Sequence, residues 1–254
     1  GVAKWGYQMT PHDEWDYDSI NEHVLWDIDG KKLVSHFDRN GFAYTWDRTN
    51  GTLLVAEKFH PNMVNWSTGV DLKTGIPAKD AKYSTHQDYN AKGICPAALG
   101  IKDEQPAAFS PRTGHFYVPL NHVCMTYEPV ESKYIAGQPW VGSTLTMFAG
   151  PDGVMGGFTA WDGLAGKQVW YNKEKFSAWG GALATASDLV FYGTLDRWFK
   201  ALDARTGKEL WKAQVGSGVI GNAITYAHKG KQYVAVFSGI GGWAGVALNL
   251  GLTN

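Results

Sequence analysis

The chain has 254 residues, enough for one large or two ordinary domains, and 44% of them are hydrophobic. A net charge of -1 without a run of Lys or Arg argues against nucleic-acid binding. No apolar stretch reaches the ~18 residues of a membrane-spanning helix. Twelve Trp, 12 Tyr and 31 Gly indicate many short strands rather than helices. The opening GVAKWGYQ has neither an initiator Met nor a signal-peptide pattern, so we expect a processed chain or a fragment.

The first stretch with chemical content is HDEWDYD, residues 12–18, in which carboxylates alternate with aromatic rings. On an extended backbone Asp16 and Asp18 point to one face, while Trp15 and Tyr17 point to the other. Such carboxylates can bind a hard cation, divide into general acid and base, or flank a glycosidic bond. A solvated turn capped by aspartates is the alternative, and the spacing alone gives it equal weight.

Arg39 follows in the sequence DRNG, which predicts a hairpin tip. An arginine at such a tip is usually solvated. A functional Arg39 would instead present its planar fork of donors to a carbonyl or a carboxylate. The residue alone does not decide between these roles.

Residues from about 80 to 150 look like a loop-rich insertion. Its cysteines, Cys95 and Cys124, can form one disulfide or remain two buried thiols. A zinc site would need ligands in closely spaced pairs, which are absent from the sequence, so a disulfide that pins the insertion is the better prediction. Asp103 lies in a Gly/Pro-rich loop, where an acidic residue usually belongs to a turn.

A repeat of strand, Asp-x-x-x-Gly turn and strand runs through the chain. It is clearest at Asp162–Gly166 and Asp203–Gly207, recurs at Asp47–Gly51, and has a weaker echo at Asp71–Gly75. The Asp side chain caps the turn and Gly supplies the positive φ. The spacing of roughly 41 residues between the two clearest copies is the length of a four-stranded propeller blade.

Two tryptophans stand beside glycines, Trp179 in FSAWGG and Trp243 in GIGGWAG. A ring in this setting packs between propeller blades or lies against a flat ligand that the glycines allow to approach. Composition alone favours packing for Trp179.

We therefore predict an all-β fold that is a β-propeller or part of one. A β-sandwich is the alternative, but it would not need the repeat. At ~41 residues per blade the chain holds at most six blades, and the insertion reduces this to four or five.

The motifs resemble those of one family. In order, the chain carries KWGYQMTPHDEWDYD, HFDRNGFAYTWDRTNGTLL, GICPAALGIKDEQPAAFSP, NHVCMTYEP, FSAWGGALATASDLVFYGTLD and GIGGWAG. In this order they resemble PQQ-dependent alcohol dehydrogenases, above all methanol dehydrogenase large subunits of the lanthanide-dependent Xox type. The resemblance implies an eight-bladed propeller with PQQ on its axis. Because the family chain is much longer, residues 1–254 would form the C-terminal part of a single PQQ-binding propeller domain.

The resemblance also implies roles for individual residues near the cofactor. Asp16 would be the catalytic base and, with Asp18, a metal ligand. Calcium enzymes usually carry a small residue at the position of Asp18; a trivalent ion favours the additional anionic oxygen. Arg39 would reach the quinone oxygens. Asp103 would lie near PQQ, where calcium enzymes carry Asn.

Further assignments rest on the same resemblance. Trp179 would lie at the cofactor's edge and Trp243 in the substrate cavity, while Cys95 and Cys124 would form a structural disulfide. The family's vicinal disulfide, its stacking Trp and its Glu and Asn metal ligands are absent from this sequence. We therefore expect that the chain alone does not complete a metal or cofactor site.

The function implied is oxidation of methanol or another primary alcohol to the aldehyde, with hydride transfer to PQQ and electrons passed to cytochrome c. The cofactors would be PQQ and a lanthanide ion, with calcium as the alternative. We expect a periplasmic homodimer of the full enzyme that includes the remaining N-terminal part. The rival functions are a calcium-type PQQ alcohol dehydrogenase, a non-catalytic propeller that binds a protein, and a carboxylate-pair hydrolase.

Overall fold

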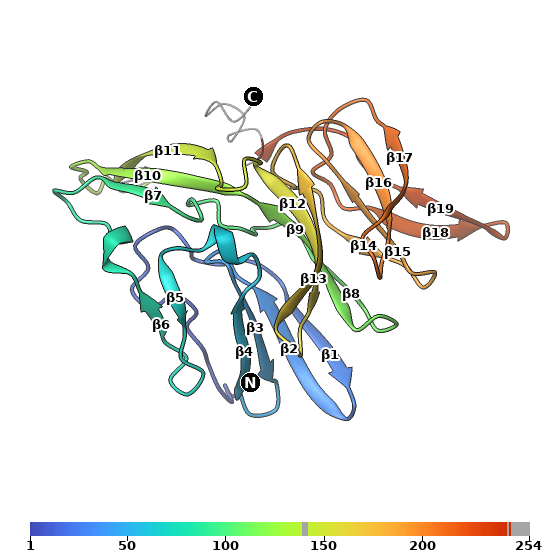
Figure 1. The fold of residues 1–254 in the computed structure, drawn as a ribbon, viewed down its shortest axis with the longest axis horizontal. Helices are drawn as coiled ribbons and strands as arrows, with labels where there is room; N and C mark the ends of the chain where they lie inside the picture. The colour runs from blue at the N-terminus through green and yellow to red at the C-terminus, as the bar shows by residue number, and fades with distance from the viewer. Residues whose placement is uncertain (139–141, 243, 245–254) are drawn as a thin grey trace.

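The computed structural model describes residues 1–138, 142–242 and 244, and strands dominate it (Figure 1). The named elements other than strands are two single 3-10 turns, η1 (Pro61–Met63) and η2 (Ala81–Tyr83). Within these ranges no helix has the length and apolar character needed to cross a membrane.

Three four-stranded antiparallel sheets form the main body. The first has the order β1-β2-β3-β4, the second β13-β12-β9-β8 and the third β14-β15-β16-β17. Their strands are β1 (His23–Ile28), β2 (Lys31–Phe37), β3 (Phe42–Asp47), β4 (Leu53–Lys58), β8 (Ala108–Ser110), β9 (His115–Asn121), β12 (Gly156–Asp162), β13 (Lys167–Glu174), β14 (Leu183–Ala184), β15 (Leu189–Gly193), β16 (Trp198–Asp203) and β17 (Glu209–Gln214). These sheets lie side by side in Figure 1 as propeller blades do, which confirms the predicted all-β, part-propeller fold.

Smaller sheets account for the other strands. They are β5 (Ser67–Val70) with β6 (Pro77–Lys79), β7 (Ala91–Ile94) with β10 (Val123–Pro129) and β11 (Ser143–Ala149), and β18 (Ile224–His228) with β19 (Lys231–Ala235). The segment expected to be a loop-rich insertion thus contains five strands, and two of them, β8 and β9, belong to a blade. The Asp-x-x-x-Gly pattern is not visible in this segment because the β8–β9 turn has Ser110 in place of Asp. The backbone of the turn is nevertheless the same, since Gly114 N donates to Ser110 O at 2.9 Å.

The predicted Asp-x-x-x-Gly turns are present. In the turn after β16, Gly207 has a φ of 72° and its N donates to Asp203 O at 2.9 Å, while Asp203 Oδ1 accepts from Arg205 N at 3.0 Å. Trp170, on β13 of the preceding blade, packs over this turn. Its Nε1 donates to Ala204 O at 3.0 Å, and a Cβ on Gly207 would lie 2.6 Å from its ring. Glycine is therefore required both by the backbone and by the tryptophan of the neighbouring blade.

Aromatic side chains fill the interior. Trp46, Trp66 and Trp161 are almost fully buried, and the rings of Phe158 and Tyr192 stack at 4.0 Å between the second and third blades. Such rings supply most of the apolar area that a sheet-on-sheet core buries. They fix the relative position of the blades, from whose ends the candidate site is built.

Candidate functional site

The acidic loop, residues 13–18, is a capped turn. Asp13 accepts two backbone hydrogen bonds, from Trp15 N to Oδ1 at 2.9 Å and from Tyr17 N to Oδ2 at 2.6 Å. Between them Asp16 has a φ of 71°, in the left-handed region. The extended backbone predicted for this stretch is therefore wrong, because the Asp13 cap bends the chain. The expected capping role of Asp13 is confirmed.

The aromatic residues of the loop anchor it from below. Trp15 and Tyr17 are almost fully buried and stack on each other at 5.5 Å, and both contact the ring of Trp66, with centroids 4.9 and 5.7 Å from it. Trp15 Nε1 donates to Tyr83 O at 2.7 Å, and the Tyr17 hydroxyl donates to Pro96 O at 2.6 Å. The alternation of aromatic and acidic residues in the sequence thus separates the buried rings of Trp15 and Tyr17 from the exposed carboxylates of Asp16 and Asp18.

The carboxylates converge on Arg39. The side chains of Asp16 and Asp18 are 66% and 78% exposed, whereas that of Arg39, between β2 and β3, is only 12% exposed. Its Nη2 lies 3.4 Å from Asp16 Oδ2 and its Nη1 lies 3.6 Å from Asp18 Oδ1, while Nη2 also donates to Ala98 O. Arg39 is therefore not a solvated tip residue, and the structure brings together these three predicted site residues.

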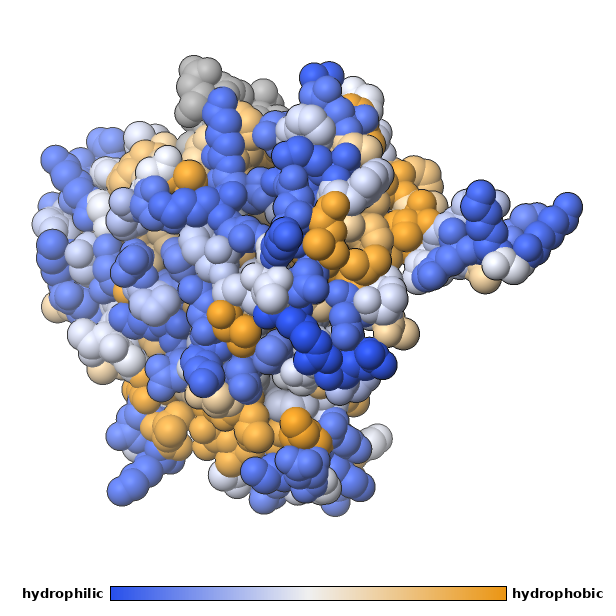
Figure 2. All heavy atoms as spheres, turned by 45° about the vertical axis from the view of Figure 1, so that its right-hand side comes forward, coloured by the Kyte–Doolittle hydropathy of each residue, from blue (hydrophilic) through white to orange (hydrophobic). Residues whose placement is uncertain are grey.

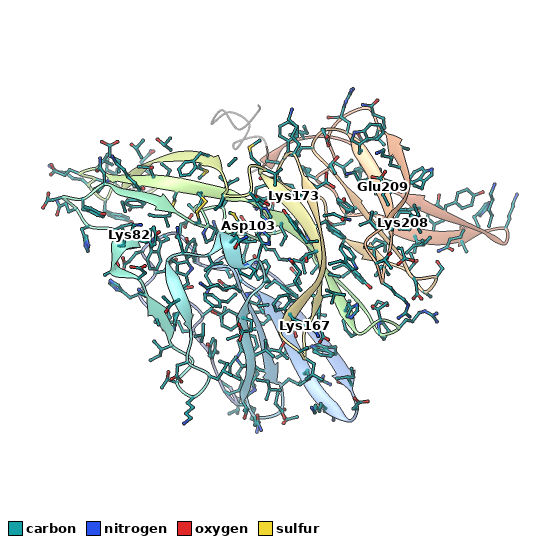
Figure 3. The ribbon with its side chains drawn as sticks, viewed as in Figure 1. Lys82, Asp103, Lys167, Lys173, Lys208 and Glu209 are labelled. Carbon is teal, nitrogen blue, oxygen red and sulfur yellow. A yellow bond between two sulfur atoms is a disulfide. The ribbon has the colours of Figure 1, made fainter. Side chains whose placement is uncertain are left out.

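Asp103 completes the acidic character of the region, and Figure 3 shows it near the centre of the molecule. Burial raises the pKa of its carboxyl group, and the charges of Arg39 and Lys102 oppose that rise. Among the described residues, Asp103 Oδ1 is buried without a hydrogen-bond partner. Such an oxygen is costly to leave unpaired, so it indicates a missing donor or cation.

The ion pair that holds the loop of Asp103 was not predicted from the sequence. Lys102 is fully buried, and its Nζ lies 2.8 Å from Glu22 Oε2. The other oxygen of Glu22 accepts from Ala107 N at 2.7 Å, so Glu22 ties down both sides of the loop. The partners are 80 residues apart, and no motif spacing connects them.

Trp179 is buried and lines a cavity of about 210 Å³ together with Gln105, Asn222 and other residues. Its Nε1 has no hydrogen-bond partner within the described part of the chain. A Cβ on the following Gly181 would collide with Asn222 and Pro106, so this glycine serves the packing of the chain itself. Trp243, predicted to lie in the substrate cavity, falls outside the described residues.

A second cavity, of about 670 Å³, opens beside the acidic loop. Asp16 and Asp18 line it, opposite residues of β10 and β11. Cys95 and Cys124 form a disulfide with an S–S distance of 2.00 Å, which confirms the predicted pairing. Because Pro96 adjoins this disulfide, the carbonyl that holds Tyr17 belongs to a cross-linked backbone.

The pKa of Asp16 is raised to about 6 in the metal-free chain. The largest cause is desolvation by the surrounding protein, which raises the Asp16 pKa. The charge of Arg39 lowers this pKa, and the charges of Asp18 and Asp13 raise it further. We expect Arg39→Gln to move the Asp16 pKa upward, because this substitution removes the lowering charge.

Carboxyl-carbon NMR titration of the metal-free chain would measure this shift. Asp47, whose pKa is lowered by hydrogen bonds from Thr49, is the internal control, since it should titrate at the same pH in both proteins. An Asp16 midpoint that stays put or falls in Arg39→Gln would contradict the assigned coupling.

The chain is similar to proteins of known class. Residues 157–234 match the PQQ family model described as glucose/ethanol/alcohol dehydrogenase, beta-propeller domain. With the acidic loop and the blades, this match defines the class: the chain is part of a quinoprotein β-propeller.

The particular relatives are methanol dehydrogenases. The chain is 62% identical to the lanthanide-dependent methanol dehydrogenase of Methylorubrum extorquens, over 100% of this chain and 44% of that protein. It is 48% identical to methanol dehydrogenase [cytochrome c] subunit 1 of the same organism, over 98% and 41%. A solved europium-containing methanol dehydrogenase superposes with a TM-score of 0.92 at 48% identity, over 97% of this chain and 44% of that one.

The chain therefore belongs to the PQQ-dependent alcohol dehydrogenases and is closely related to their lanthanide-dependent methanol dehydrogenases. It spans less than half of the length of these relatives.

Proposed function

We propose that the full-length protein oxidises a primary alcohol, methanol or a close analogue, to the aldehyde with PQQ and a lanthanide ion. The observation that carries this proposal is that two exposed carboxylates, Asp16 and Asp18, both contact the guanidinium of Arg39, whose side chain is only 12% exposed. A non-catalytic binding propeller gives no reason for this arrangement. A hydrolase with two carboxylates gives no reason for Arg39.

The residues present fit a hard, highly charged cation. Asp16, Asp18 and the unpaired Asp103 Oδ1 offer anionic oxygen, the donor type that such ions prefer. One Arg39 charge does not neutralise this group, so a bound cation would lower the repulsion that raises the Asp16 pKa. Asp18 supplies the additional negative charge that favours a trivalent over a divalent ion.

When bound, PQQ supplies the hydride acceptor and the metal supplies a Lewis acid. The chain's own residues do the rest. Asp16 in its deprotonated form accepts the proton of the substrate hydroxyl. Arg39 contacts both carboxylates, so its charge offsets part of their mutual repulsion, and its guanidinium would offer donors to the quinone oxygens of PQQ. The buried rings of Trp15 and Tyr17 keep this geometry fixed during turnover.

We further propose that the remaining part of the protein packs on the third blade and the β18–β19 hairpin. Trp211 on β17 holds the position that Trp170 holds one blade earlier, yet it is 51% exposed. Phe237 and Ile224 are exposed nearby in the chain, and Figure 2 shows apolar surface beside the projecting hairpin. A patch of this kind marks a packing surface.

We also propose that the electron acceptor is a cytochrome c and that the protein is periplasmic. The name of the 48%-identical relative includes cytochrome c, which supports cytochrome c as the acceptor here. A disulfide between Cys95 and Cys124 supports a periplasmic home, since disulfides persist in oxidising compartments. We also propose that the full enzyme is a homodimer.

The test uses the full-length protein purified from cells that make PQQ and are supplied with a lanthanide. We expect a PQQ absorbance band and methanol-dependent reduction of an electron-accepting dye. Omitting the lanthanide should abolish the activity, and adding calcium should not restore it. Absence of both the band and the activity in folded protein would overturn the proposal, whereas activity with calcium alone would assign the calcium type.

A further inference from the structure

A second group of metal-binding side chains lies away from the acidic loop. It contains His60, which precedes η1; His122, between β9 and β10; and Asp152, between β11 and β12. Their ligand atoms all lie within 4.8 Å of one another. Three connections that are distant in sequence thus meet at one point, and none of these residues lines the cavity at the acidic loop.

The group holds an unusual number of buried atoms without partners. Within residues 1–138, 142–242 and 244, both nitrogens of His60, Nε2 of His122 and Oδ1 of Asp152 are buried and make no hydrogen bond. His60 is 6% exposed and His122 is fully buried. A buried polar atom without a partner is costly, because it has lost its hydrogen bonds to water. Four such atoms around one point indicate a missing water molecule or ion.

The donor set favours a metal. Two imidazoles and one carboxylate are the ligands of many zinc sites that keep an open position. The closest approaches are those of His122 Nδ1 and His60 Nε2 to Asp152 Oδ2, at 3.4 and 3.9 Å. Ligand atoms of a tetrahedral zinc ion lie about 3.4 Å apart, so the spacing of these atoms is already close to that of a zinc site.

We propose that His60, His122 and Asp152 form a site for one divalent transition-metal ion of the zinc type, which ties together the three connections. Both imidazoles are in the form that binds a metal. Burial, the main cause, lowers the pKa of His60 and brings that of His122 to about 3. At neutral pH neither ring has to lose a proton first.

One ring must turn when the metal binds. The rings of His60 and His122 are stacked with centroids 4.2 Å apart and 10° between their planes. A metal lies in the plane of each imidazole that it binds, and two parallel stacked rings share no such point. His60 is the ring that turns, because it has no hydrogen bond to break among the described residues, whereas His122 Nδ1 lies 3.0 Å from the Tyr171 hydroxyl.

One neighbouring charge opposes the ion. Lys173, labelled on β13 in Figure 3, has its Nζ 3.9 Å from Asp152 Oδ2 and 3.2 Å from Asp152 O. Its side chain is more than half exposed, so it can swing away into solvent. Removing this charge should strengthen metal binding, an effect that a purely structural hydrogen-bond network does not predict.

The experiment titrates the full-length protein, stripped of weakly bound metal, with Zn²⁺ by calorimetry and with Co²⁺ by visible absorption. We expect one equivalent with imidazole ligands, its loss in His60→Gln, and its retention in His86→Gln, a change at an exposed histidine that follows η2. Lys173→Met keeps all three ligands and should tighten binding severalfold. Alcohol oxidation should be unchanged in His60→Gln, which separates this site from the proposed reaction.

Two outcomes would overturn the site. One is equal Zn²⁺ binding in the parent protein and His60→Gln. The other is a crystal soaked in Zn²⁺ that shows only water between His60 and His122. If His60→Gln fails to fold, the crystal of the parent protein soaked in Zn²⁺ decides, because water alone between His60 and His122 excludes the site.

Discussion

Replacing Asp16 with Asn should lower the kcat of alcohol oxidation in the full-length enzyme by about 10²–10⁴-fold, the contribution of a positioned general base. Asn keeps the shape of the side chain but cannot accept the substrate proton. Because Trp15 and Tyr17 hold the loop through their own contacts, the fold and PQQ binding should survive. Steady-state kinetics together with the PQQ absorbance band provide the measurement.

Asp88→Asn is the matched control for this substitution. Asp88 is exposed, is also an aspartate, and lies in a turn outside the site, so its loss should leave kcat unchanged. If Asp16→Asn retains full kcat while Asp88→Asn behaves as expected, another group takes the proton. A loss of PQQ together with activity would show instead that Asp16 is needed to build the site.

Replacing Asp18 with Ala should weaken lanthanide-supported activity far more than it weakens folding. The loss of a direct anionic ligand should raise the lanthanide concentration for half-maximal activity by at least the roughly 10–100-fold that losing a ligand-orienting partner costs. The substitution also removes one Arg39 contact, although Asp16 and the Ala98 carbonyl still hold the guanidinium. Titration of the metal-depleted enzyme with La³⁺ and with Ca²⁺ measures the change.

Asp18→Asn separates charge from size in this test. It retains an oxygen at the same reach but removes the negative charge, so a result close to that of Asp18→Ala assigns the effect to charge. An unaltered lanthanide response in both variants contradicts the ligand role of Asp18. Thermal unfolding of each variant shows whether the loss is one of stability instead.

The sequence predicted the blades where a physical pattern repeats. Asp203 and Gly207 were found because a capped turn needs those residue types at that spacing, and the structure confirms the turn. The turn between β8 and β9 was not predicted because Ser110 stands there in place of the Asp of the repeat. The alternation of rings and carboxylates in residues 12–18 predicted which side chains are buried, but not the left-handed Asp16. That conformation depends on how the Asp13 carboxylate folds back on two later amides.

The contacts between segments that are far apart in the chain could not be predicted from the sequence. Lys102 could be placed beside Asp103, but its partner Glu22 is far away in the chain and has no periodic relation to it. The same holds for His60, His122 and Asp152, each an ordinary residue of a separate connection. Only the fold brings such residues together. A single sequence carries no signal for them unless a known family supplies it.

The residues that hold the acidic loop in place affect how the activity of this protein can change by substitution. Tyr83 and Pro96 hold its rings, and Thr85 N donates to Glu14 Oε2 at 3.0 Å. All three lie in the connections between β6 and β8, outside the four-stranded blades. The blades therefore supply the frame, while the connections between β6 and β8 hold the acidic loop and its proposed reactive carboxylates in place. Substitutions in these connections can therefore change the proposed reactivity even when the blades, Asp16 and Asp18 stay the same.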